Sequence, residues 1–225
     1  MPLPRVCSED EVLAQGFAFK ASWWSRYVEP PWWPDGIDEL PDDPARPYHQ
    51  RITRQDVFNM AADRSPEGRF GLLLAAYIWG TGTSAFNVGR RVRGLTRTQP
   101  GEVGDRLVAA ADLLEAEGPV AAYASLQAGS SNHIKFLGPA FFTKYLYFAA
   151  GHPTTVKPQP LILDKFVARS VNAVFDGWTL RDHGWSARTY GQYLTLAAEQ
   201  TRKAGPPATP AGVEMALFQA HTQRG

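Results

Sequence analysis

Cysteine is almost absent from this chain of 225 residues, and so is net charge. The single cysteine, Cys7, excludes a disulfide framework, a four-cysteine iron–sulfur loop and a cysteine-built zinc site, and it is typical of a reducing, intracellular compartment. The 23 basic and 22 acidic residues leave a net charge of +1. This balance excludes a protein that coats a polyanion as histones do, but it leaves room for a local basic face.

Long hydrophobic runs are also missing. The longest apolar stretches, Leu72–Trp79 and Tyr145–Ala150, fall far short of the ~18–20 residues that a membrane span needs. The first residues carry two prolines and several acidic side chains where a signal peptide has an apolar run. We therefore expect a soluble, cytoplasmic protein with no membrane partner. Hydrophobic residues still make up 44% of the chain, which is enough for a large buried core.

The apolar residues recur at helical spacing, and no stretch alternates convincingly with the period of two of a β-strand. The sequence therefore predicts an all-α fold. The expected helices span residues 9–15, 53–63, 70–79, 85–95, 102–117, 119–127, 139–150, 165–176, 187–203 and 210–222.

Residues 29–50 contain six prolines, which exclude a regular helix. Four tryptophans in or near this segment predict that it is an extended arm docked on the body: Trp23, Trp24, Trp32 and Trp33. We therefore divide the chain into residues 1–52, a short helix followed by the arm, and residues 53–225, a helical domain.

Charge is unevenly distributed along the chain. Residues 1–60 hold 6 basic and 10 acidic side chains, a balance of −4, whereas residues 120–205 hold 9 and 4, a balance of +5. A polyanion such as a nucleic acid is therefore expected to meet residues 120–205.

Lys144 is the most unusual candidate for chemistry, because aromatic residues surround it in the sequence on both sides. A lysine that is kept from water loses its proton more readily and becomes a nucleophilic amine. The alternative is that Lys144 extends to water or lies on an exposed stripe beside Thr143.

Asp164 is the second candidate. It follows the apolar run Leu161–Leu163 and precedes the helix expected at residues 165–176, so it is placed to cap that helix. Free N–H groups and the positive helix end hold such a carboxylate ionised. Most aspartates at this position are only caps, but an ionised carboxylate near a masked lysine is also what an amine-driven glycosyl transfer needs.

These two residues resemble the signature of the helix-hairpin-helix DNA glycosylases, in particular the 8-oxoguanine branch in a short bacterial form. In that family a hairpin, here about residues 132–150, precedes a catalytic lysine, and about twenty residues later an aspartate follows in a Pro–Val–Asp-like setting. Lys144 and the segment Pro160–Asp164 match that pattern. The resemblance covers roughly residues 55–222.

A second similarity lies near the C-terminus. The segment Ala211–Phe218 resembles the branch's last helix, in which Glu214 takes the place of a glutamine that reads the base edge and Phe218 that of a phenylalanine that stacks on the base. The stretch from Tyr77 to Arg91 also resembles the segment that fills the gap left by the extruded nucleotide.

The chain departs from the family pattern in several places. Gly138 lies six residues before Lys144, Ala140 replaces a hairpin glycine, and Phe166 replaces a polar residue that often contacts phosphate. The N-terminal sheet domain of larger relatives is replaced by the tryptophan-rich arm. We therefore expect a reshaped hairpin.

The resemblance implies two helical subdomains with a cleft between them, and a DNA N-glycosylase with lyase activity that excises an oxidised or otherwise modified guanine, 8-oxoguanine first. Asp164 would stabilise positive charge on the sugar, and Lys144 would attack the anomeric carbon to form a Schiff base. Phe218 and Phe148 would stack on the flipped base, while Glu214 would accept hydrogen bonds from the guanine edge. The alternatives are a core position for Phe148 and a solvated helix position for Glu214.

Basic residues around these positions are candidates for DNA contact. Besides Gly138 of the hairpin, the candidates are Arg90, Arg91, Arg93, Arg97, Lys135, Lys157 and Lys165. An arginine run is also typical of a solvated face, and Lys135 is the substitute nucleophile if Lys144 is exposed. The five histidines show no metal-binding spacing, so we expect no metal, no cofactor and a monomer that binds DNA.

Two rival functions remain open. One is a DNA-binding protein of the same fold that has lost catalysis, and the other is a helical adaptor built around the aromatic arm. The biological role is equally open between oxidative base-excision repair and antiviral defence, where another modified guanine such as a deazaguanine would be the substrate.

Overall fold

The computed structural model describes residues 3–96 and 98–222, and helices dominate it, which confirms the predicted all-α class. No described helix is long and apolar enough to cross a membrane. In chain order, the α-helices and strands of the described residues are α1 (Glu9–Ala14), β1 (Gly16–Phe19), α2 (Ser22–Ser25), β2 (Gln50–Thr53), α3 (Arg54–Asn59), α4 (Pro66–Thr81), α5 (Ala85–Thr96), α6 (Pro100–Glu117), α7 (Pro119–Leu126), α8 (Pro139–Ala149), α9 (Lys165–Val174), α10 (Ala187–Ala204) and α11 (Pro210–Thr222).

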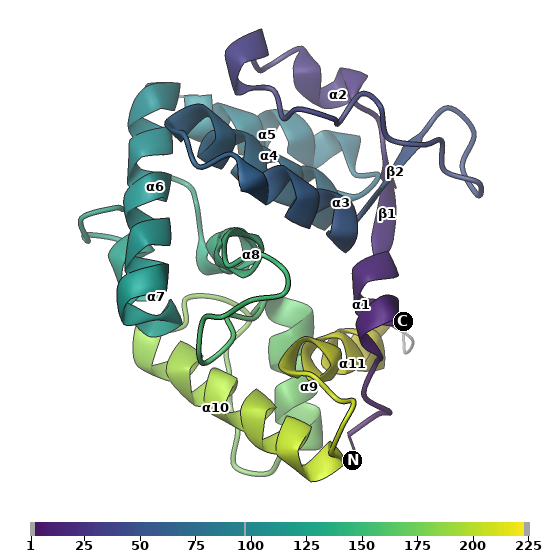
Figure 1. Ribbon diagram of the computed structural model, residues 1–225, viewed down its shortest axis with the longest axis vertical. Helices are drawn as coiled ribbons and strands as arrows, with labels where there is room; N and C mark the ends of the chain where they lie inside the picture. The colour runs from purple at the N-terminus through teal and green to yellow at the C-terminus, as the bar shows by residue number, and fades with distance from the viewer. Residues whose placement is uncertain (1–2, 97, 223–225) are drawn as a thin grey trace.

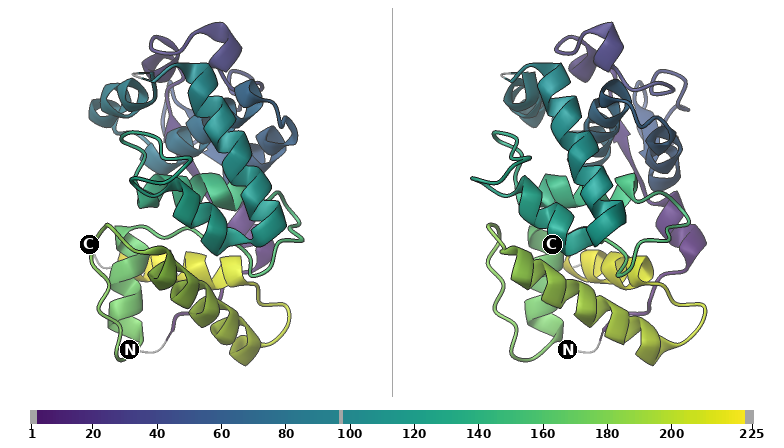
Figure 2. Two further views of the ribbon diagram at one scale, coloured as in Figure 1. Left: turned by 90° about the vertical axis from the view of Figure 1, so that its left-hand side faces the viewer. Right: turned by 60° about the vertical axis from the view of Figure 1, so that its left-hand side comes forward.

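The helices form two groups, with α8 between them (Figure 1). The helices α3 to α6 and the strand pair lie on one side of α8, and α9, α10 and α11 lie on the other, while α7 lies beside α8 and packs against both α6 and α10. Both turned views in Figure 2 keep this division, with the green and yellow helices below the blue and teal ones. The chain therefore passes from the first group to the second through α8 and the loop that follows it.

Local capping signals set where the N-terminal helices begin. Ser8 caps α1 and Thr53 caps α3, and each forms a capping box with the acidic residue three positions on, Glu11 and Asp56. Past Asn59 the helix tightens into a single 3₁₀ turn, Met60–Ala62. These helices follow the sequence prediction closely because their start signals are local.

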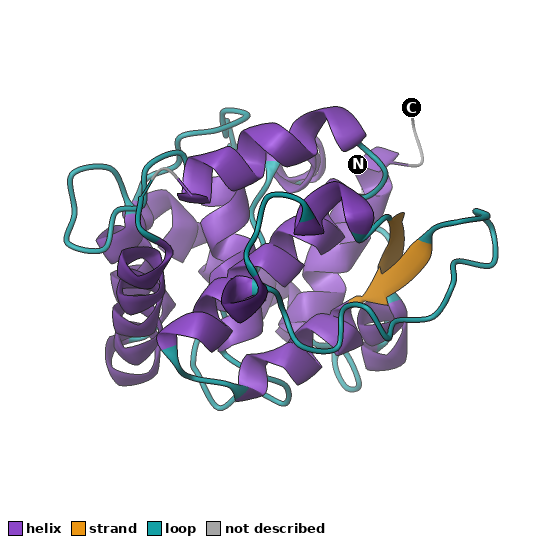
Figure 3. Cartoon of the chain, turned by 90° about the horizontal axis from the view of Figure 1, so that it is seen from above, coloured by secondary structure: helices purple, strands orange, loops and turns teal. Residues whose placement is uncertain are grey.

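The prediction that no segment forms a strand is wrong for eight residues. Strands β1 and β2 pair antiparallel, from Gly16 opposite Thr53 to Phe19 opposite Gln50. A strand of four residues is too short to show a clear period of two. The pairing forms because the proline-rich arm returns to the body at β2, and the loop that leads into β2 projects from the helices (Figure 3).

The arm packs against the helical body through its tryptophans. Trp24 is fully buried, and the Trp32 ring meets Phe70 of α4 edge-on at 5.3 Å. Trp33 donates a hydrogen bond to Asp38 within the arm (2.9 Å). Residues 29–50 are therefore a docked segment of irregular structure that contains one short 3₁₀ turn, Pro30–Trp32.

Helix α4 is the centre of the first group. Every residue from Arg69 to Trp79 is buried, and α4 packs against both α6 and α8. The predicted apolar face of α6 is buried as well, with Val103, Leu107 and Leu114 fully enclosed. Gly104 lets the two helices approach, because a β-carbon there would overlap the backbone of Pro66 at the start of α4.

Gly104→Ala should therefore destabilise the protein even though alanine favours a helix. The overlap would force α4 and α6 apart, at an expected cost of about 1–3 kcal/mol in the free energy of unfolding. Gly101→Ala in the same helix is the matched control, since its β-carbon would lie 3.9 Å from the nearest atom outside the helix. Urea unfolding should leave the control unchanged or up to about 1 kcal/mol more stable. Equal effects of the two substitutions would contradict this packing.

Candidate active site

Helix α8 presents Lys144 inside the protein. The helix begins at Pro139, directly after Gly138, as the sequence predicts. Lys144 lies in its second turn and is only 4% exposed, and its neighbour Thr143 is fully buried. The alternative of a lysine on an exposed stripe is therefore wrong, and so is the condition under which Lys135 would replace it.

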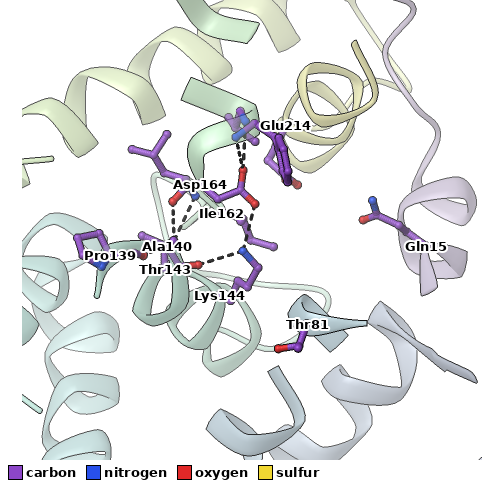
Figure 4. A network of polar contacts seen from close by, with 12 residues as sticks. Gln15, Thr81, Pro139, Ala140, Thr143, Lys144, Ile162, Asp164 and Glu214 are labelled. Carbon is purple, nitrogen blue, oxygen red and sulfur yellow. Dashed lines mark hydrogen bonds and ion pairs between the residues drawn. The ribbon is translucent and has the colours of Figure 1, made fainter. Parts of the chain in front are cut away.

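The Lys144 ammonium has two polar partners (Figure 4). Its Nζ donates to the carbonyl oxygen of Ala140 at 3.0 Å and to Oδ2 of Asp164 at 3.3 Å. It also lies 5.3 Å from the ring centre of Phe141. The structure thus brings together the two residues that the sequence pairs twenty positions apart.

Asp164 uses its two carboxylate oxygens for different purposes. As the N-cap of α9, it accepts hydrogen bonds at Oδ1 from the amides of Phe166 (2.9 Å) and Val167 (3.1 Å). Its Oδ2 faces Lys144. The carboxylate is therefore an anchor for the second helix group and the counter-ion of a lysine from α8.

The segment before Asp164 is fixed on both sides. On the α8 side, the amide of Leu163 donates to the Thr143 hydroxyl oxygen (3.2 Å). On the α10 side, the hydroxyl groups of Tyr190 and Tyr193 donate to the carbonyls of Leu161 (2.9 Å) and Ile162 (3.1 Å). These contacts fix the backbone before Asp164 and so fix the position of its carboxylate relative to Lys144.

The electrostatic surroundings keep Asp164 ionised. Burial by itself would raise the pKa of this carboxyl group, but the Lys144 ammonium and the two α9 amides outweigh burial and lower the pKa below its ordinary value. A permanent negative charge next to a buried amine is the arrangement that the proposed chemistry requires.

Gly80 in α4 makes room for the stem of Lys144. A β-carbon at Gly80 would lie 2.9 Å from Cε and 3.0 Å from Cδ of Lys144. Even a methyl group at this position would push the lysine side chain aside. Gly80 therefore contributes to the site because its missing side chain leaves room for Lys144. The sequence analysis did not identify Gly80.

A second buried ion pair lies beside the first. Nη1 of Arg54 and Oε2 of Glu214 are 2.8 Å apart, and both side chains are almost completely buried. The Arg54 Nε donates to the side-chain oxygen of Gln15 (2.7 Å), and the guanidinium lies 5.1 Å from the ring centres of Trp79 and Tyr147. This pair joins α3 to α11, and hence one helix group to the other.

Sequence analysis missed Arg54. One signal was available, because Arg54 opens a helix directly after the capping Thr53, and a cation at that end is opposed by the helix dipole. Burial lowers the pKa of Arg54, but Glu214 and the Tyr147 hydroxyl raise it further, so the guanidinium stays charged. Its partner could not be recognised in the sequence, since 160 residues separate the two.

For Glu214 the sequence left two roles open, base reading and a solvated helix position. The alternative of a solvated helix position is wrong, because the side chain is buried and paired with Arg54. Burial raises the pKa of Glu214, against the attraction of Arg54. Both Asp164 and Lys144 act on its charge, so the four residues form one cluster with two cations and two anions. Base reading by Glu214 stays a prediction, and it requires the carboxylate to turn from Arg54 towards the base.

The two stacking candidates lie in different surroundings. Phe218 on α11 is half-buried and meets the Phe166 ring edge-on at 5.9 Å, next to the start of α9. Phe148 is fully buried, with its ring 5.0 Å from Phe58 and 5.6 Å from Trp79. Phe148 therefore occupies the core position that the sequence left open as the alternative.

The arginines of α5 line a pocket of about 460 Å³ next to Lys144. Its other lining residues are Tyr77, Asn87, Phe136 and Phe141, and Arg90, Arg91 and Arg93 complete it. Arg91 is partly buried: its guanidinium lies 4.1 Å from the ring centre of Phe141 and donates to the Thr81 hydroxyl, and burial lowers its pKa. The Phe141 ring thus contacts both the Arg91 guanidinium of this pocket and the Lys144 ammonium. Arg97 lies outside the described residues.

The remaining candidates for DNA contact are exposed, and they lie in different parts of the structure. Lys165 follows Asp164 directly, with its ammonium 4.8 Å from the Phe166 ring centre. Lys135 and Gly138 lie in the segment before α8, and the Lys135 ammonium is 5.3 Å from the ring centre of Phe136. Lys157 lies apart, in a hollow that it shares with Arg64 and Glu115.

The Asp164 charge should contribute to stability in a defined pH range. Its pKa is lower in the folded state than the unfolded value of about 3.9, so protons favour the unfolded chain as the pH falls. Compared with Asp164→Asn, the wild type should be more stable by about 1–3 kcal/mol at pH 7. This difference should stay constant down to about pH 5 and shrink as the pH falls through the folded-state pKa.

Urea unfolding between pH 3 and pH 7 measures this difference. Asp105→Asn, an exposed aspartate on α6, is the control and should show no such pH-dependent loss. A wild-type advantage that stayed constant at pH 3 would show that the Asp164 charge is not stabilised in the folded state.

One family model matches most of this chain. A family model described as "Putative 8-oxoguanine DNA glycosylase OGG-like protein" matches residues 10–218. No curated protein and no solved structure gives a match. The matched range includes both buried ion pairs, the arginine pocket and the whole arm. The chain therefore belongs to this OGG-like family.

Proposed function

We propose that the protein is a DNA N-glycosylase with lyase activity that excises a modified guanine, with 8-oxoguanine as the first candidate substrate. The observation that carries this proposal is the buried Lys144 amine held 3.3 Å from the capped Asp164 carboxylate. We further propose that it acts as a monomer on cytoplasmic, nucleoid DNA.

The chemistry begins with a base turned out of the duplex, because the glycosidic bond is out of reach inside the helix. As the bond to the base breaks, positive charge develops on the sugar, and the ionised Asp164 stabilises it. The Lys144 amine, after giving up a proton to the departing base, attacks the anomeric carbon. Ring opening then gives a Schiff base, and β-elimination breaks the bond from the sugar to the 3′ phosphate.

The base pocket would be formed at the start of α9 and the end of α11. Phe218, which is only half-buried, offers a ring face for stacking. Glu214 would accept hydrogen bonds from N1–H and the N2 amino group of guanine once its carboxylate turns from Arg54. Adenine and the pyrimidines lack this double-donor edge, so the pocket would favour guanine derivatives in general. A panel of lesions, including deazaguanines, separates a repair role from a defence role.

The arginine pocket would receive the DNA next to the flipped nucleotide. Arg90 and Arg91 would bind phosphates or the unpaired opposite base, and the amides around Gly138, with Lys135, would contact the strand from the hairpin. Phe86, at the start of α5 beside the pocket residue Asn87, is 91% exposed. We propose that this ring fills the gap that the base leaves, a role that the sequence assigned only to the segment as a whole.

Borohydride trapping tests the nucleophile. Reduction of the Schiff base should link wild-type protein covalently to lesion-containing DNA, and Lys144→Gln should abolish this adduct. Lys135→Gln is the matched control and should trap like the wild type, because Lys135 is exposed. Trapping by Lys144→Gln would show that the nucleophile is misassigned. Salt-dependent DNA binding without trapping or base release by the wild type would identify the inactive DNA-binding protein.

Gly80→Ala tests the geometry around Lys144 without changing an ionisable group. The added methyl group should displace the lysine stem and slow trapping by roughly tenfold or more. Gly71→Ala in the same helix is the control, because its β-carbon would lie 3.4 Å from the nearest atom, an ordinary contact. Single-turnover trapping at saturating DNA measures both. Equal rates for the wild type and Gly80→Ala would contradict the assigned position of the amine.

A further inference from the structure

The segment before the arm, residues 20–27, adds a cationic and aromatic surface to the arginine pocket. Helix α2 packs beside α5 (Figure 1), and the two meet at Gly89. A β-carbon at Gly89 would lie 2.9 Å from the Tyr27 hydroxyl and 3.6 Å from Nη2 of Arg93. We call the surface formed by Lys20, Trp23, Arg26, Tyr27 and Arg93 the α2–α5 surface.

The two segments that build this surface contain no carboxylate. Residues 12–28 hold two basic side chains and residues 68–101 hold five, without one aspartate or glutamate. Among the ion pairs of the described residues, none involves Lys20, Arg26 or Arg93. The positive charge of the surface is therefore not neutralised by ion pairs in that part of the chain.

Lys20 and Arg26 each lie over an aromatic ring. The Lys20 ammonium is 5.5 Å from the ring centre of Trp23, and the Arg26 guanidinium is 4.9 Å from that of Tyr27. Arg26 is exposed and Lys20 is partly exposed, so both cations can reach a partner beside these rings. Alternation of cations and aromatic groups is typical of surfaces that follow a nucleic-acid backbone.

The surface is continuous with the proposed reaction site. Arg93 belongs to it and also lines the arginine pocket, whose Phe141 wall contacts the Lys144 amine. DNA that places a nucleotide at Lys144 and phosphates at Arg90 would therefore extend towards α2. The acidic side chains of the arm lie in residues 29–43, outside these two segments.

We propose that the α2–α5 surface binds the phosphate backbone of the DNA beside the reacting nucleotide, which rests on the glycosylase function proposed above. Its role is affinity and placement, without contact to the reacting atoms. The N-terminal region, which is acidic as a whole, thus supplies part of the DNA interface.

The test removes Lys20 and Arg26 together. The double variant Lys20→Ala/Arg26→Ala should bind a duplex with an abasic-site analogue roughly tenfold or more weakly at about 0.1 M salt. The slope of log affinity against log salt concentration should fall by about 1.8, or about 0.9 for each phosphate contact. Fluorescence anisotropy at several salt concentrations measures both, and thermal unfolding confirms that the variant folds.

The matched control is Arg202→Ala/Lys203→Ala. It removes two exposed cations from the last turn of α10, in the helix group on the other side of α8 (Figure 1). The control should keep the wild-type affinity and slope. Trapping at saturating DNA should be unchanged in both double variants, because neither alters Lys144 or Asp164.

The outcomes separate this surface from the proposed function. Unchanged affinity and slope in Lys20→Ala/Arg26→Ala would overturn the surface even if the wild type traps DNA. A loss of affinity confined to this variant supports the proposed role of the surface in DNA binding. This holds even if the wild type fails to trap DNA, because that failure would contradict only the proposed catalysis. An equal loss in the control would overturn the surface as a distinct interface.

Discussion

The contact between Lys144 and Asp164 is the interaction on which the rest of the site depends. A buried ammonium is costly unless an anion and further hydrogen bonds compensate it. Asp164 supplies the anion, and the same carboxylate caps α9, so the helix that follows it and the lysine before it constrain each other. Moving α9 relative to α8 would therefore disturb both the cap and the ion pair. The fold positions the Lys144 amine through its ion pair with Asp164, which lies where the two helix groups meet.

Arg54 and Glu214 form a second ion pair between the same two helix groups. Without Arg54, Glu214 would be a buried carboxylate near Asp164, and repulsion between the two would disfavour the ionised state of both. Arg54 gives Glu214 its own cation, which leaves the charge of Asp164 available for Lys144. Buried ion pairs of this kind contribute little net stability, but they penalise every arrangement that separates the partners. The two pairs thus favour one relative position of α3, α8, α9 and α11.

The distribution of charge in space differs from its distribution along the chain. The sequence places the basic excess in residues 120–205, where Lys165 directly follows Asp164 and Lys135 directly precedes the pocket residue Phe136. Lys157 of the same stretch lies in a separate hollow beside Glu115. Three arginines of α5, a stretch outside that range, instead line the pocket next to Lys144. A regional sum of charges cannot find such a face, because it ignores which side of each helix meets the solvent.

The sequence by itself determined most of the helices and several of their starts, and its resemblance to a known family pointed to the central pair. Capping residues such as Thr53 and Asp164, the proline that opens α8 and the helical spacing of apolar residues act within a few positions, so they can be recognised locally. Only the tertiary structure decided that β1 pairs with β2, that Glu214 has Arg54 as its partner and that Phe148 lies in the core. Each of these depends on residues far apart in the chain, and their contact follows from how whole helices pack.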